Sequence, residues 1–135
     1  MTIFLKSYFV PTTKEIDFIP IIHDLRYAIR DSQMAEGLLT VHVPSDGANI
    51  IITKEVEIDK LKERFKNIPL PGNRSLSLPF QKRELVLEPK QMIYLVDFSA
   101  TEKRREFVVQ ILGEAPAAQQ PPGGPRPQPP GGKRK

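Results

Sequence analysis

The chain has 135 residues, which is enough for one domain and too few for two. Hydrophobic residues make up 39% and charged residues 27%, a composition typical of soluble globular proteins. Cysteine is absent, which excludes a disulfide framework, a thiolate zinc site and a cysteine nucleophile. Because no apolar run approaches the roughly 20 residues of a membrane span, and the start lacks a signal-peptide pattern, we expect a cytoplasmic protein without a membrane partner.

Composition divides the chain into two segments. Residues 115–135 hold seven of the 14 prolines, four of the eight glycines and four basic residues, with no acidic residue. The other 16 basic residues equal the 16 acidic ones in number, so residues 1–114 carry no net charge. We predict a folded domain over residues 1–114 and a disordered, basic, Pro/Gly-rich tail over residues 115–135. A domain without net charge does not have the composition of a basic nucleic-acid reader.

The folded segment alternates between two hydrophobic periods. Alternating or continuous apolar runs predict strands, and apolar residues three and four positions apart predict helices. In chain order, we expect strands over 3–10 and 15–19, a helix over 21–34, strands over 38–43 and 49–53, a helix over 56–68, and strands over 75–78, 84–87, 91–98 and 104–112. These elements predict an α+β domain in which two helices pack on a mainly antiparallel sheet.

Three local features refine this prediction. Gly37 follows the first helix and is expected to end it. The connection between the last two strands is short, which favours an antiparallel hairpin. The charged residues 102–105 run from that connection into the last strand; they could contact an anion, but are interpreted as a solvated turn that discourages pairing at the sheet edge.

Motifs of common enzyme chemistry are absent from the sequence. It contains no glycine-rich nucleotide-binding loop and no GxSxG. The only histidines, His23 and His42, have no partner at metal-ligand spacing, so structural or surface roles are favoured over a metal or acid–base role. Ser45 and Asp46 follow His42, but a nucleophilic serine also needs an oriented base, and this pattern is more typical of a turn. We therefore predict no catalytic residue, no metal and no cofactor.

Three segments, taken in order, resemble the YjbQ-like family, also called the secondary thiamine-phosphate synthase family. They are EGLLTVHVP at 36–44, SLSLP at 75–79 followed by ELVL at 84–87, and QMIYLVDF at 91–98 followed by RREFVVQILGE at 104–114. The resemblance spans about residues 2–114 and has no counterpart for the tail. It implies an α+β fold, a homotrimer, a histidine-rich polar pocket and a weak thiamine-phosphate-forming activity.

The chain departs from the family at the loops that carry the pocket. The family's His-Thr-Thr-Ala-Gly falls at residues 45–49, which read SDGAN, and its Asn-Glu falls at Thr53 and Lys54. The loop after the second helix shrinks to 67–73 without a histidine, and the family's Gly-Thr-Trp aligns with 88–90, which read EPK. Imidazoles supply metal ligation and acid–base chemistry near neutral pH. We therefore expect a shortened pseudoenzyme in which no catalytic residue is retained.

Two functions of the folded segment follow from these departures. The favoured one is a non-catalytic binding or structural protein, expected to be a homotrimer. The alternative is an enzyme with a remade pocket, similar to a thiamine-phosphate synthase and lined by Ser45, Asp46, Thr53 and Lys54. A bound phosphate would favour this alternative, and the sequence itself names no small-molecule ligand.

A further alternative assigns the function to the tail. Arg126, Lys133, Arg134 and Lys135 could attract an anionic partner such as a nucleic acid, although four charges give weak, salt-sensitive binding. Residues 127–130, PQPP, also suit a proline-recognition module. Three tails in a trimer would gain avidity. A solubilising tail without a partner is favoured over both.

Overall fold

The structure is a computed structural model that describes residues 2–64 and 72–114. The predicted tail, the end of the second predicted helix and most of the loop after it lie outside the described residues. The described elements are β1 (Thr2–Pro11), β2 (Asp17–Pro20), α1 (Ile22–Ser32), β3 (Glu36–His42), β4 (Ala48–Lys54), the 3-10 helix η1 (Glu55–Glu57), α2 (Ile58–Arg64), β5 (Ser75–Gln81), β6 (Glu84–Leu85), β7 (Gln91–Asp97) and β8 (Arg104–Glu114). The predicted α+β fold with antiparallel strands and two helices is confirmed.

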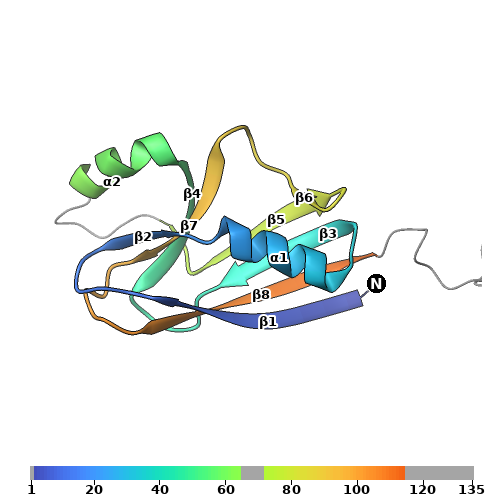
Figure 1. Ribbon diagram of the computed structural model, residues 1–135, viewed down its shortest axis with the longest axis horizontal. Coiled ribbons are helices and arrows are strands. Elements are labelled where there is room, and N and C mark those ends of the chain that lie inside the picture. The colour runs from blue at the N-terminus through green and yellow to red at the C-terminus, as the bar shows by residue number, and fades with distance from the viewer. Residues whose placement is uncertain (1, 65–71, 115–135) are drawn as a thin grey trace, which may run out of the picture.

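The strands form two sheets. A five-stranded sheet has the order β1-β8-β3-β5-β6, and a three-stranded sheet has the order β2-β7-β4. All pairings within both sheets are antiparallel. The sheets meet where the amide of Ile50 in β4 donates to the carbonyl of Asn73, just before β5, at 2.8 Å. Figure 1 shows α1 lying across the five-stranded sheet and α2 at the far end of the molecule, near β4.

The predicted hairpin between the last two strands is wrong. β7 is the middle strand of the smaller sheet, and β8 lies between β1 and β3 in the larger one. Residues 93–97 of β7 are all buried, so both faces of this strand are covered, whereas β8 alternates between buried and more exposed positions. A short connection permits a hairpin. However, β7 must be covered on both faces and β8 mainly on one, so the two strands pair with different neighbours. The chain therefore changes sheets between residues 98 and 103.

The main core lies between the larger sheet, α1 and the smaller sheet. α1 contributes the apolar stripe that the helical spacing predicts, and β3 contributes Leu39 and Val41, followed by Val43. β8 contributes alternate residues from its inward face, among which Phe107 stacks on Tyr8 of β1 at a ring distance of 5.5 Å. The alternation of the strands and the period of the helix thus converge on one core.

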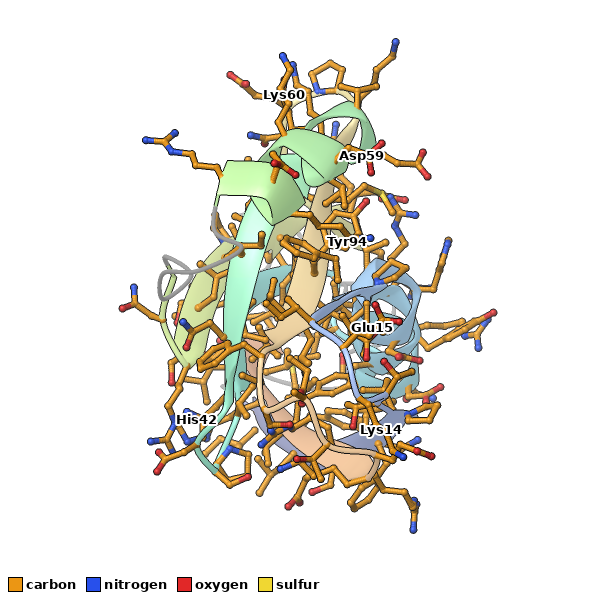
Figure 2. The ribbon with its side chains drawn as sticks, turned by 90° about the vertical axis from the view of Figure 1, so that its left-hand side faces the viewer. Lys14, Glu15, His42, Asp59, Lys60 and Tyr94 are labelled. Atoms are coloured by element: carbon orange, nitrogen blue, oxygen red, sulfur yellow. The ribbon has the colours of Figure 1, made fainter. Side chains whose placement is uncertain are left out.

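A smaller apolar cluster covers the other face of the smaller sheet. Its buried residues are Tyr94 and Val96 of β7, and Phe18 and Ile58 pack against them. Figure 2 shows Tyr94 lying below α2. Both faces of the smaller sheet are therefore covered. The larger sheet is covered on one face only. No described element covers the face opposite α1, and Ile3, Leu5 and Leu38 on that face are exposed.

Gly37 does not end the helix as the sequence suggested. The helix ends at Ser32, the following Gln33 caps it in the left-handed conformation with φ 61°, and Gly37 lies within β3. Gly37 is paired with Gly113 of β8. A Cβ atom on Gly37 would lie 2.1 Å from the carbonyl oxygen of Leu112, and one on Gly113 would lie 2.3 Å from that of Glu36. The two glycines therefore allow the close approach of β3 and β8.

We expect Gly37→Ala to lower the free energy of unfolding by at least about 2 kcal/mol, because the methyl group must displace the backbone of β8. Urea unfolding followed by circular dichroism measures this change. Thr40→Ala is the control in the same strand, since it only removes a hydrogen bond to Ser77. Equal stability of Gly37→Ala and the wild type would contradict the close approach.

Candidate functional site

The loop between β3 and β4 carries two of the residues that the sequence analysis singled out, Ser45 and Asp46. Gly47 closes the loop with φ +100°, a conformation that side chains rarely adopt, and its carbonyl accepts the amide of Phe98 at 2.8 Å. A Cβ on Gly47 would lie 2.9 Å from Nη2 of Arg105. The glycine thus lets the loop lie directly against an arginine of β8.

A buried ion pair lies behind this loop. Nε of Arg105 donates to Oδ2 of Asp97 at 2.8 Å, and their side chains are 1% and 0% exposed. Asp97 is the last residue of β7 and Arg105 is the second residue of β8, so the pair connects the two sheets across the change of sheet. Oδ1 of Asp97 accepts the amide and the hydroxyl of Ser99 at 3.0 and 2.6 Å. Both carboxylate oxygens are therefore bound.

The hydrogen bonds decide the charge state of Asp97. Burial raises the pKa of this carboxyl, but hydrogen bonds from Ser99 and from the guanidinium of Arg105 lower it by more. The net pKa lies below the ordinary value of an aspartate. Since arginine stays protonated at all ordinary pH values, both partners are charged at neutral pH.

Arg105 also holds the loop itself. Its Nη1 donates to the carbonyl of Asp46 at 2.8 Å and to Oγ of Ser45 at 3.0 Å. Its Nη2 is buried and has no hydrogen-bond partner among the described residues. Ser45 is thus an acceptor for a cation, and this contact positions the loop.

A second arginine holds the outside of the same loop. Nε of Arg74 donates to the carbonyl of Val43 at 3.1 Å, and Nη2 donates to the carbonyl of Pro44. Its Nη1 lies 3.2 Å from Oδ1 of Asp46, whose side chain is 98% exposed. An ion pair this exposed contributes little to stability, so the contacts of Arg74 with the two carbonyls matter more.

The other two pocket candidates lie elsewhere. Thr53 and Lys54 end β4 and pair with Met92 and Gln91, whereas the loop with Ser45 precedes Ala48 at the start of that strand. Six residues of extended chain separate the two ends of β4 by about 20 Å. Figure 2 shows His42, near the loop, far from Asp59 and Lys60 on α2, which follows Lys54. One chain therefore does not bring the four candidates together.

The histidines and the tail candidates complete the sequence-based set. His23 lies on the exposed side of α1. Nδ1 of His42 is hydrogen-bonded to Oγ of Ser75 across β3 and β5, on the face of the larger sheet opposite α1. The described ranges hold no group of three or more histidines and acidic residues that could bind a metal. The basic residues of the tail, Arg126, Lys133, Arg134 and Lys135, lie outside the described residues.

Sequence reasoning missed the two residues on which the loop depends. Residues 102–105 were expected to be a solvated turn, and this is wrong for Arg105, which is buried. The missed signal is the phase of the strands. Arg105 occupies the inward alternation of β8 with Phe107 and Val109, and Asp97 occupies that of β7 with Leu95. Opposite charges at two inward positions are typical of a buried pair.

No protein-family model and no curated protein matches the sequence, but several solved structures share the fold. A YjbQ/UPF0047-family protein from Clostridium acetobutylicum aligns over 79% of this chain and 99% of its own, with a TM-score of 0.68 and 21% identity. A protein of unknown function from Sulfolobus solfataricus, described as YbjQ-like, aligns over 84% and 99%, with a TM-score of 0.69 and 20% identity. A conserved hypothetical protein from Thermus thermophilus aligns over 79% and 99%, with a TM-score of 0.63 and 20% identity.

The resemblance to the YjbQ-like family is thus confirmed at the level of the fold. The alignments cover 99% of each of these similar chains. In addition, none of the helices in the described ranges has the length and apolar character to cross a membrane.

We expect Asp97→Asn to lower the free energy of unfolding by about 3 kcal/mol, because it leaves the buried Arg105 charge without a counter-charge. The acid response should change as well. The folded-state pKa of Asp97 lies below its unfolded value of about 3.9. The stabilisation is therefore fully present above that value and is lost as pH falls through the folded pKa.

Urea unfolding between pH 7 and pH 2.5 tests both effects. The difference between wild type and Asp97→Asn should be large at pH 7 and should shrink in the acid range. Asp46→Asn, which changes an exposed carboxylate, should stay within about 1 kcal/mol of wild type. If Asp97→Asn and Asp46→Asn had equal effects, the ion pair would not hold the loop.

Proposed function

We propose that the protein is a YjbQ-like family member that has lost the catalytic pocket and acts as a non-catalytic binding or structural homo-oligomer in the cytoplasm. One observation carries this proposal. The loop that the resemblance aligns with the family's His-Thr-Thr-Ala-Gly is bound from behind by Arg105, whose charge is balanced by Asp97. Contacts within the protein thus occupy the place where the family's chemistry is expected.

The chemistry of these residues supports the loss of activity. A general acid or base works best when its pKa lies near the operating pH, and an arginine does not release its proton at neutral pH. Oγ of Ser45 accepts a hydrogen bond from that arginine, and the nearest histidine in sequence, His42, binds Ser75. Among the described residues, the loop therefore offers no histidine base to Ser45, and its carboxylate, Asp46, points to solvent beside Arg74.

The assembly is the second part of the proposal. The resemblance implies a homotrimer, and the uncovered face of the larger sheet supports self-association. In such an assembly, contacts between copies of the chain would perform the structural role, and no small-molecule site is needed.

Two alternatives have specific support. The buried Nη2 of Arg105, which has no described partner, favours an anion beside Ser45 and hence an enzyme with altered chemistry. Within one chain, Thr53 and Lys54 lie at the end of β4 that is far from Ser45. They would therefore join this site only if a second chain supplied them. The basic tail favours a weak, salt-sensitive contact with an anionic partner.

Native mass spectrometry of the full-length protein tests the proposal, together with an assay of thiamine-phosphate formation. We expect an oligomer without bound metal or phosphorylated ligand, and a rate no higher than that of a buffer blank. An active thiamine-phosphate synthase is the positive control. A stoichiometric phosphorylated ligand or metal, or turnover above the blank, would contradict the loss of activity. A monomer would contradict the structural homo-oligomer.

The tail alternative is tested by comparing the wild type with a variant whose tail has no positive charge. In the full-length chain, Arg126, Lys133, Arg134 and Lys135 are all replaced by glutamine, and binding to a single-stranded oligonucleotide is measured at low salt. We expect the wild type to bind no more tightly than this variant. Binding that the substitutions abolish would support a tail-mediated partner.

A further inference from the structure

We propose that the uncovered face of the larger sheet is the surface through which copies of this chain contact one another. The proposal names the interface of the proposed homo-oligomer and therefore depends on it. This surface, the outer face, consists of twelve residues in three rows of four.

The register of the sheet defines the outer face. Each row crosses β1, β8, β3 and β5 in that order, and its members point away from α1. The rows are Ile3, Leu112, Leu38 and Pro79; then Leu5, Gln110, Thr40 and Ser77; then Ser7, Val108, His42 and Ser75. The residues between them in each strand lie on the side of α1, where Leu39, Val109 and Ile111 are buried.

The outer face carries no Asp, Glu, Lys or Arg, although these make up 27% of the chain. Charged residues begin only at its two ends, with Glu36, Glu84 and Glu114 beyond the first row and Glu106 and Arg104 beyond the last. A sheet face exposed to water is usually polar on that side. Loss of charge at the centre with charge at the rim is instead the pattern of a protein interface.

Large apolar side chains on the outer face are exposed to an unusual degree. Ile3 is 65% exposed, Leu5 66% and Leu38 41%. Ile3 and Leu38 lie on either side of Leu112 in the first row, and Leu5 follows Ile3 on the same face of β1, so these side chains form one patch. A contiguous apolar patch on a sheet face indicates a surface that another protein surface covers.

The shape of the outer face favours a second copy as the partner. The β1 side carries the large Ile3 and Leu5, whereas the β5 side carries the small Ser75 and Ser77, the latter hydrogen-bonded to Thr40 at 2.7 Å. The large side chains of β1 in one copy can therefore pack on the small side chains of β5 in another copy. Flat sheet faces pack readily on one another at about 10 Å.

Charge and area point to the same partner. A nucleic acid or an acidic protein would be recognised by lysine and arginine, and the outer face has neither. Its three rows and four strands project roughly 400 Å², about half of the 800 Å² that each partner buries in a typical stable interface. The outer face thus supplies the uncharged centre of an interface, and the charged rows at its ends supply the rim.

Sedimentation velocity of full-length Leu5→Glu against wild type tests the proposal. A glutamate in the middle row places an unpaired charge at the centre of the contact, so we expect the association constant to fall about 100-fold or more and the variant to sediment as a monomer. The matched control is Val56→Glu, which changes a residue that is 77% exposed in η1 and should leave the assembly intact. Circular dichroism checks that both variants fold.

A second variant, Ser77→Glu, tests the β5 side of the outer face and keeps the experiment decisive if Leu5→Glu does not fold. Dissociation by Leu5→Glu or Ser77→Glu, with Val56→Glu still assembled, would support the proposal. A wild-type oligomer that neither charge weakens would overturn this interface and leave the proposed homo-oligomer standing. A wild type that is monomeric at micromolar concentration would overturn both.

Discussion

The ion pair between Arg105 and Asp97 is the interaction on which the arrangement of the two sheets depends. It lies where the chain leaves β7 in one sheet and enters β8 in the other, and both side chains are almost fully buried. Burying two charges costs solvation free energy, so the pair persists only because hydrogen bonds satisfy it. Ser99 binds the carboxylate, and the loop at Ser45 binds the guanidinium. One contact therefore fixes the change of sheet and the loop together.

This arrangement determines which surface remains available for function. The resemblance to the YjbQ-like family implies that the loop after β3 is part of a histidine-rich pocket. In this chain, polar atoms of the loop are bound by Arg105 and Arg74 instead. The outer face of the larger sheet is different, since no described element covers it and it carries no charge. A loop held by the chain's own arginines and an uncharged sheet face are both compatible with the proposed function, that of a protein that works through contact between its copies.

Much of the fold could be predicted from the sequence because strand alternation and helical spacing are local. The inward set at Leu39, Val41 and Val43 is an example. The pairing of strands was not predictable in the same way, since β7 and β8 are adjacent in sequence but need different neighbours to bury their faces. Gly37 was misassigned because the glycine is required by the backbone of β8, where Gly113 lies opposite it, and this contact is not local in sequence.

The candidate site was predictable only in part. The sequence analysis names Ser45 and Asp46 because the resemblance aligns their loop with a family motif. Thr53 and Lys54 lie at the other end of β4, and no sequence rule brings two ends of a strand together. Arg105 was missed because a charged run suggests solvent, although its phase in β8 places it inside.

Solvent paramagnetic relaxation of methyl groups in the full-length protein, with a dissolved gadolinium chelate, tests whether a second copy covers the outer face. We predict slow relaxation at Ile3 and Leu5 and fast relaxation at the similarly exposed Val56; equal relaxation at all three would contradict a covered outer face.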